Sequence, residues 1–310
     1  MIDYHCHLLP GLDDGAASWD DSLRMARALA RFGFREVCCT PHCIKGHYEI
    51  SPVEVRDAVR HLQARLDGEG LALTLRPGME YYLDEFFEQF AANLLPLGDS
   101  RVVLCEAPPQ APPELVCEMV TLIVIQGYIP LIAHPERSEV IWQLIEAPPC
   151  ASGTTGQGDG FGHARANGES REPAAVGQEG DGGGWWRRLA PRSAGPLASD
   201  ASRAAGRAPR FSGRTPALAS APLELPDACL FQASLGSFTG FYGPKPQRRA
   251  YELLQRGVYH CLASDLHDAH SASEFLEEAH DKLTFNPALK RLGAFVAPQG
   301  GGGNNQLAFW

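Results

Sequence analysis

The 310-residue chain lacks several features that would place it in common classes of protein. It has no uninterrupted apolar run of about 18 residues, so no membrane span is expected. Its first residues form neither a basic region nor a long apolar core, so we expect no signal peptide. Lys and Arg number 27 against 37 Asp and Glu, which gives a net charge of −10. This acidic balance argues against a surface that coats nucleic acid.

Cysteine is present, but not in the pattern of a disulfide framework. The nine cysteines are an odd number with irregular spacing, and Cys38, Cys39, Cys105 and Cys261 lie in short apolar runs. Buried free thiols in a reducing cytoplasm are therefore expected. None of the nine has an arginine six residues further on, which argues against the phosphate loop of a cysteine-dependent phosphatase. There is no Walker-type loop either.

The sequence does contain a repeated order of apolar run, polar residue and helical segment. After a short apolar start, strands are predicted near residues 36–40, 71–75, 101–105, 129–133, 228–232 and 259–263. Helices are predicted near residues 19–32, 52–66, 84–92, 113–126, 245–256, 273–283 and 287–292, with another up to about residue 145 and a Gly-rich loop over 237–243. This alternation predicts an α/β protein with a parallel sheet and helical crossovers.

The composition changes between residues 147 and 223, where Gly, Ala, Ser, Arg and Pro dominate without aliphatic periodicity. Such a segment cannot bury enough apolar surface to offset the entropy of ordering it. We therefore expect residues 1–146 to form the first part of a barrel, 147–223 a disordered insertion, 224–297 the remainder of the barrel and 298–310 a flexible tail.

The first candidate site lies at the start of the chain, where two histidines stand one residue apart. In a strand, His5 and His7 point to the same face and can aim at one point. A Gly/Pro-rich turn then delivers Asp14. Two imidazoles and a carboxylate are a plausible metal-binding set, although a lone pair of histidines is as often unrelated to metal.

Similar polar residues follow the other predicted strands, which strengthens the metal interpretation. The full candidate set is His5, His7, Asp14, His42, Glu80, Glu106, His134, Asp265 and His267. In parallel α/β barrels, side chains at the carboxyl ends of strands converge. Nine ligands exceed the needs of one ion, so two or three ions are implied. Nitrogen and oxygen ligands without thiolate suit Mn, Fe or Zn, and such multi-metal sites hydrolyse phosphate esters.

Several motifs resemble the PHP (polymerase and histidinol phosphatase) superfamily, and most closely its bacterial capsule-type protein-tyrosine phosphatases. They are His5-Cys6-His7, Pro10-Gly11-Leu12-Asp13-Asp14-Gly15, Thr40-Pro41-His42, Gly78-Met79-Glu80, the run from Gly127 to Arg137 and Ser264-Asp265-Leu266-His267. The resemblance implies a distorted (β/α)7 TIM-like barrel with a trinuclear, commonly manganese, site. It also implies a cytoplasmic enzyme that dephosphorylates a tyrosine kinase of capsule or exopolysaccharide production, and each of the family's nine metal positions has a matching ligand here.

The chain departs from the family pattern near the expected substrate site. Cys43 stands where a second histidine is usual, and the family motif Gln-x-Asn-Ala-Gly-Ser appears as Gln232 to Ser237 without the asparagine. The family arginine that follows Ser-Asp-x-His is absent from residues 268–274. Phosphate clamping then falls mainly on Arg137, and Asp14 could also help the phenolate to leave.

Two other functions remain open at this point. A PHP phosphatase could act on a small phosphoester such as histidinol phosphate, although the capsule-type motifs argue against it. Alternatively, a catalytically weakened barrel could serve as a scaffold that binds a kinase. The long insertion and the missing asparagine and arginine favour the scaffold slightly, whereas the complete ligand set disfavours it.

Overall fold

The computed structural model describes residues 1–146 and 224–298. The expected disorder of residues 147–223 and most of the expected flexible tail fall outside these residues. The strands of the described part are β1 (Ile2–Cys6), β2 (Glu36–Cys39), β3 (His42–Cys43), β4 (Thr74–Pro77), β5 (Glu80–Tyr82), β6 (Val102–Glu106), β7 (Ile129–Ile132), β8 (Leu230–Ser234) and β9 (Cys261–Ala263).

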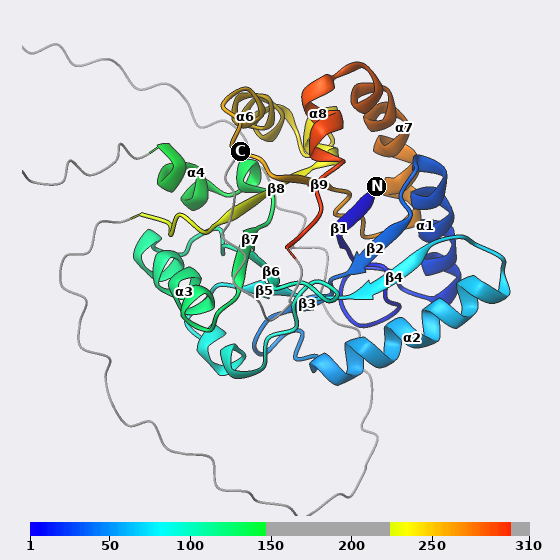
Figure 1. Cartoon of the computed structure of the whole chain (residues 1–310), viewed down its shortest axis with the longest axis horizontal. Helices are drawn as coiled ribbons and strands as arrows, with labels where there is room; N and C mark the ends of the chain where they lie inside the picture. The colour runs from blue at the N-terminus through cyan, green and yellow to red at the C-terminus, as the bar shows by residue number, and fades with distance from the viewer. Residues whose placement is uncertain (147–223, 299–310) are drawn as a thin grey trace, which may run out of the picture. The chain divides into compact units, whose positions relative to one another are not determined.

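All neighbouring strands pair in parallel, in the orders β1-β2-β4 and β3-β5-β6-β7-β8-β9. β2 leads into β3 through Thr40 and Pro41, and β4 leads into β5 through Gly78 and Met79. Each of these pairs is one bent strand that passes from the first sheet to the second. The nine strands therefore occupy seven successive positions along the curved sheet (Figure 1).

The two ends of this sheet meet beside β1. The backbone N–H of Asp265 donates to the carbonyl of His5 at 2.8 Å, and that of His7 donates to the carbonyl of Leu266 at 3.0 Å. Cys6 and Leu266 form a parallel bridge. The buried Asp3 carboxylate accepts hydrogen bonds from the Ser264 backbone N–H and hydroxyl at 2.9 and 2.6 Å. The expected α/β fold of barrel type is thereby confirmed.

Helices α1 (Trp19–Phe32) and α2 (Pro52–Gly68) begin and end where their sequences indicate. The Ser18 side chain accepts a hydrogen bond from the Asp21 backbone, and Gly33 ends α1 in the left-handed region at φ 115°. Ser51 and Glu54 form a reciprocal capping box at the start of α2. The other helices are α3 (Pro113–Ile125), α4 (Glu139–Glu146), α5 (Leu235–Thr239), α6 (Pro244–Gln255), α7 (Ala269–Phe285) and α8 (Pro287–Leu292).

Two local predictions were wrong. Instead of a helix over 84–92, two short 3-10 helices cover Phe87–Gln89 and Ala91–Asn93. Hydrogen bonds over three residues tighten this segment while Phe87 and Ala91 turn into the core. The expected loop over 237–243 is partly helical, because α5 extends to Thr239 before the chain turns at Gly240, where φ is 83°.

The core has two parts that the strands separate. The larger part lies between strands and helices. The smaller part takes side chains such as Tyr4, Cys38, Leu131 and Cys261 from strands round the sheet and includes no helical residue, which places it inside the barrel. The Tyr4 hydroxyl donates to the carbonyl of Phe295 at 3.2 Å and accepts from the Ala297 backbone N–H at 3.0 Å. The segment after α8 therefore packs against this interior.

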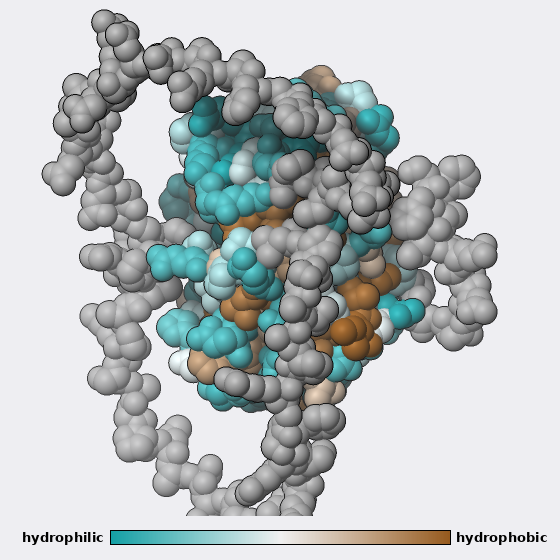
Figure 2. Space-filling view, turned by 90° about the vertical axis from the view of Figure 1, so that its left-hand side faces the viewer, coloured by the Kyte–Doolittle hydropathy of each residue, from teal (hydrophilic) through white to brown (hydrophobic). Residues whose placement is uncertain are grey.

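The surface adds two observations. On the face shown in Figure 2, the described residues are mostly hydrophilic, with smaller hydrophobic patches among them. No helix within residues 1–146 and 224–298 combines the length and apolar character needed to cross a membrane.

Candidate metal centre

The structure brings all nine candidate ligands together at the carboxyl ends of the strands. They fall into four overlapping groups whose ligand atoms lie within 4.8 Å of one another. The groups are His7/Asp14/His42/His267, His5/His7/Glu80, His5/His134/Asp265 and His42/Glu80/Glu106. Because His5, His7, His42 and Glu80 each belong to two groups, the groups form one continuous cluster.

Strained backbone at two strand ends aims side chains into this cluster. His134, after β7, has φ 32°, and Asp265, after β9, has φ 53°; no other non-glycine residue in the described ranges has positive φ. Such conformations are costly and persist where the surrounding structure enforces them. Here the Gln232 side chain accepts from the His134 backbone N–H at 3.3 Å. The His5 backbone carbonyl accepts from the Asp265 backbone N–H.

The loop after β1 folds tightly over His7. The Ala16 backbone N–H donates to the His7 carbonyl at 3.0 Å, so the chain returns to its own starting point. A Cβ atom on Gly15 would lie 2.2 Å from the His7 carbonyl oxygen and 2.5 Å from its Cβ. Only glycine therefore permits this close approach, which explains the Gly after the two aspartates of the motif.

Hydrogen bonds at Nδ1 fix the tautomers of three histidines. His7 Nδ1 lies 2.7 Å from the Asp13 carboxylate, and His5 Nδ1 lies 3.2 Å from the side-chain Oε1 atom of Gln232. His267 Nδ1 lies 3.1 Å from the Asp265 backbone carbonyl. Each of these oxygens accepts, so each Nδ1 carries the proton. The Nε2 lone pairs remain available as ligands, in the arrangement that metal-binding histidines usually have.

Glu80 lies at the centre of the cluster and is 1% exposed. Its Oε2 atom is 3.1 Å from His5 Nε2 and 3.1 Å from His42 Nδ1. Its Oε1 atom is 3.3 Å from His134 Nε2. Although these nitrogens are near, neither oxygen makes a hydrogen bond of good geometry, and the same is true of His42 Nδ1 and Asp14 Oδ1. Buried polar atoms without partners are costly, so these four atoms fit divalent cations well.

Burial and neighbouring charges displace the pKa values of these groups in opposite directions. Burial lowers the pKa of His42, but the Glu80 carboxylate outweighs it and raises this pKa to about 9. Burial and the Arg137 guanidinium lower the pKa of His134 to about 4. Burial and the Glu80 carboxylate raise the pKa of Glu106. Bound cations would offset the repulsion between the crowded carboxylates and would replace the protons that otherwise lie between these groups.

The predicted phosphate clamp, Arg137, lies at the edge of the cluster with a side chain 21% exposed. Its guanidinium forms an ion pair with Asp265 and lies over the Tyr242 ring, 4.1 Å from the ring centroid. The Tyr242 hydroxyl donates to the same Asp265 carboxylate at 3.2 Å. Arg137 is thus close to the candidate ligands and still accessible to an anion.

Sequence reasoning missed two buried acids near the cluster. Asp13 was treated only as part of a motif, yet it accepts from His7 and from the His42 backbone N–H at 2.9 Å. Glu136, which is fully buried, accepts from the Ser234 backbone N–H at 3.1 Å and from the Tyr259 hydroxyl at 2.7 Å. Both acids lie within two residues of a candidate ligand, Asp14 or His134, but spacing alone does not show which groups they contact.

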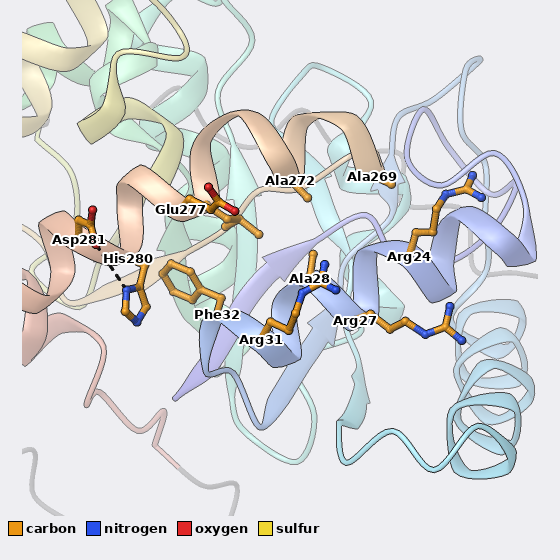
Figure 3. A pocket seen from close by; sticks show the side chains of 11 residues that line it. Arg24, Arg27, Ala28, Arg31, Phe32, Ala269, Ala272, Glu277, His280 and Asp281 are labelled. Carbon is orange, nitrogen blue, oxygen red and sulfur yellow. Dashed lines mark ion pairs between the residues drawn. The ribbon is translucent and has the colours of Figure 1, made fainter.

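A separate cavity of about 640 Å3 lies away from the nine candidate ligands (Figure 3). It runs between α1 and α7, and Figure 3 shows Arg24, Arg27 and Arg31 along α1 on one side of it. Arg24 and Arg27 form ion pairs with Asp21 and Glu69. The cavity shares no residue with the metal-ligand groups and is not part of this centre.

Comparison with known proteins identifies the family that this arrangement resembles. Residues 1–147 match the family described as capsular polysaccharide synthesis, CpsB/CapC. The resemblance inferred from the motifs is therefore confirmed. The match includes seven of the nine candidate ligands, and Asp265 and His267 lie beyond it.

Curated relatives support the same assignment over the first part of the chain. The chain is 38% identical over 165 residues to the tyrosine-protein phosphatase YwqE of Bacillus subtilis, which covers 50% of this chain and 65% of the relative. It is 31% identical over 145 residues to the tyrosine-protein phosphatase CpsB of Streptococcus pneumoniae, covering 46% and 59%. The chain thus spans less than two thirds of the length of these relatives in sequence.

A solved structure extends the likeness beyond the first part. It is described as one of YwqE from Bacillus subtilis and CpsB from Streptococcus pneumoniae, unique metal-dependent tyrosine phosphatases. The TM-score is 0.57 with 26% sequence identity, and the match covers 96% of this chain and 98% of the other.

Proposed function

We propose that this chain is a metal-dependent phosphomonoester hydrolase that acts as a protein-tyrosine phosphatase. The observation that carries the proposal is the single cluster of nine nitrogen and oxygen ligands with four buried, unpartnered polar atoms. Relatives of the chain are tyrosine-protein phosphatases. The substrate we propose is a phosphotyrosine protein, specifically a bacterial tyrosine kinase of capsule or exopolysaccharide biosynthesis.

Each group of ligands has a role in this proposal. The four overlapping groups would hold two or three ions, with manganese as the first choice. His5 and His7 would each give only the Nε2 lone pair, because their Nδ1 atoms are hydrogen-bonded, whereas Glu80 offers two carboxylate oxygens. Bound divalent cations would lower the pKa of water at the site and offset charge on phosphoryl oxygens. Asp13 and Gln232 would keep the His7 and His5 rings oriented.

The chain's own polar groups would handle the substrate. Arg137 offers guanidinium N–H groups to the phosphoryl oxygens, where charge-assisted hydrogen bonds are strongest. Asp14 has an unpartnered Oδ1 atom 3.6 Å from His42 Nε2 and 3.7 Å from His267 Nε2. We assign it as a ligand through Oδ1, and propose that its other carboxylate oxygen relays a proton from solvent to the leaving phenolate.

The decisive experiment compares substrates on protein of known metal content. Protein purified without added metal is analysed for bound elements, then loaded with Mn2+, Fe2+ or Zn2+ and assayed with a phosphotyrosyl peptide and with histidinol phosphate. We expect bound metal, and a kcat/KM for the peptide that exceeds that for the small phosphoester. Faster turnover of histidinol phosphate would instead favour the small-molecule phosphatase.

A scaffold that binds a kinase remains the second candidate. It is favoured by Ser234, which stands where the family motif has its asparagine. If metal-loaded protein hydrolyses no phosphoester while a His7→Ala variant binds the kinase as well as the parent does, the scaffold replaces the phosphatase.

The cytoplasm is the compartment that we propose for this activity. Eight cysteines lie in the described residues, all are free thiols, and seven of them are buried. A reducing compartment keeps thiols in this form. A tyrosine kinase substrate with its phosphorylated segment in the cytoplasm would be accessible there.

A further inference from the structure

Arg137 does not stand alone at the edge of the metal centre, because Tyr242 contacts it and its acidic partner. The guanidinium carbon lies 4.1 Å from the Tyr242 ring centroid. The Tyr242 hydroxyl and the Arg137 guanidinium both donate to Oδ2 of Asp265. These three side chains form a triangle in which each member contacts the other two.

The loop between α5 and α6 holds Tyr242 firmly. A Cβ atom on Gly236 would lie 2.8 Å from Cε2 of Tyr242, so the ring is seated against bare backbone on one side. Phe241 packs edge-to-face on Tyr242 and also contacts Phe275 of α7, with ring centroids 5.0 and 5.1 Å apart. The ring is therefore a fixed surface, and the flexible partner of the contact is Arg137.

We propose that Tyr242 is a positioning residue that presents the Arg137 guanidinium to the phosphoryl group. The inference rests on the proposed phosphatase function and adds a residue to it. A guanidinium over an aromatic face is stabilised electrostatically, and its rotation is restricted before substrate arrives. The Tyr242 hydroxyl also donates a hydrogen bond to Asp265 Oδ2, so this oxygen has less capacity to accept from Arg137. Other guanidinium N–H groups are then left to bind an incoming anion.

The sequence explains why such support would matter in this chain. Residues 268–274 contain no arginine, so the clamp depends on Arg137. A single long side chain loses conformational freedom when it binds an anion. A fixed ring beneath the guanidinium reduces that loss because the ordering is already present in the free protein.

The test measures binding of inorganic phosphate to the full-length, Mn2+-loaded chain by calorimetry. The variants are Tyr242→Phe, which keeps the ring, Tyr242→Leu, which removes it, Arg137→Ala, and Arg137→Ala combined with Tyr242→Leu. Tyr251→Leu is the matched control, since its hydroxyl donates to the Phe238 carbonyl in α5 and it belongs to none of the metal-ligand groups. Elemental analysis and a thermal melt accompany each variant.

We expect Tyr242→Leu to weaken phosphate binding by about 10- to 100-fold, the usual cost of losing a partner that orients a site residue. Tyr242→Phe should cost less, because the face under the guanidinium remains. In the Arg137→Ala background, Tyr242→Leu should cost nothing further, since interacting residues are not additive. Metal content and the control variant should match the parent.

Three results would overturn the inference. The first is an equal effect of Tyr242→Leu with and without Arg137, the second is loss of metal in Tyr242→Leu, and the third is a parent that binds no phosphate. The phosphotyrosyl peptide assay separates this failure from that of the proposed function. If the parent hydrolyses the peptide and Tyr242→Leu binds phosphate normally, only the role of Tyr242 fails. If phosphate binding changes as expected among the variants but the parent does not hydrolyse the peptide, only the proposed phosphatase function fails.

Discussion

The Nε2 atoms of His5 and His7 lie 2.9 Å apart inside the protein, where both side chains are fully buried. The Nδ1 atoms of the two rings are committed to oxygen acceptors, so two nitrogen lone pairs face each other. Such a contact is unfavourable without a proton or a cation between the rings. Glu80 Oε2, 3.1 and 3.4 Å from these nitrogens, points to the same location.

The first prediction concerns this histidine pair. His7→Ala should lower the number of bound metal ions and reduce hydrolysis of a phosphotyrosyl peptide by about 100-fold or more, because even residues that only orient ligands are worth about 10- to 100-fold. Elemental analysis and kcat/KM measure the two effects. His280→Ala, an exposed histidine outside the cluster, is the control and should match the parent. Full metal content in His7→Ala would exclude His7 as a ligand.

The second prediction concerns Asp13, which accepts from both His7 Nδ1 and the His42 backbone N–H. Asp13→Asn should weaken metal binding by about 10- to 100-fold, because the amide no longer favours the proton on Nδ1 of His7. Competition with a fluorescent chelator measures the affinity. Asp20→Asn in the first turn of α1 is the control. If both variants bind metal equally well, the Asp13–His7 hydrogen bond has no part in orienting the ring.

The third prediction concerns pH. The Glu80 carboxylate raises the pKa of His42 in the metal-free protein to about 9, so a cation must displace a proton from it at neutral pH. Apparent metal affinity should therefore rise by about tenfold per pH unit for each displaced proton up to about pH 9, and then level off. Calorimetry in buffers of different ionisation enthalpy counts the protons. Equal affinity at pH 7 and pH 9 would contradict this.

The same pKa shift predicts how pH affects the fold without metal. The folded pKa of His42 lies above the ordinary value of 6.5, so its contribution to stability is complete below that value and is lost as pH rises through about 9. The metal-free protein should melt at a lower temperature at pH 9 than at pH 6.5 by this contribution. A His42→Gln variant, which lacks the titrating group, should show a smaller difference between the two pH values.

The last prediction concerns Gly15. Because a Cβ atom would lie 2.2 Å from the His7 carbonyl, Gly15→Ala should displace the loop and lower the free energy of unfolding by about 1 to 3 kcal/mol. Metal affinity should fall with it. Gly68→Ala near the end of α2, where nothing lies within 4 Å of an added Cβ, should be neutral or stabilising. Denaturant unfolding compares the two, and similar results would remove the steric argument.

The positions of the candidate ligands could be predicted from sequence because parallel strands bring their carboxyl ends to one edge. The position of His134, for example, can be predicted from the apolar run before it and the turn after it alone. Sequence could not predict that Asp13 hydrogen-bonds to His7 whereas Asp14 belongs to a ligand group, since neighbours in a loop point in different directions. The contact between Arg137 and Tyr242 joins residues about a hundred positions apart, and local patterns contain no signal for it.

The helix predicted over 84–92 failed for a related reason. Its residues have reasonable helical propensity, but Phe87 and Ala91 must both enter the core within a short connection from β5 to β6. Tertiary packing outweighs weak local preference in such segments.

The meeting of β1 with the segment after β9 also has a consequence for biosynthesis. Asp265 and His267 lie far from His5 and His7 along the chain, yet Asp265 is close to His5 and His267 is grouped with His7 in the fold. A ribosome that has released only the first two hundred residues has therefore produced most of the ligands but not the complete cage. Full cation binding would then require synthesis to pass His267 and β1 to pair with the segment after β9.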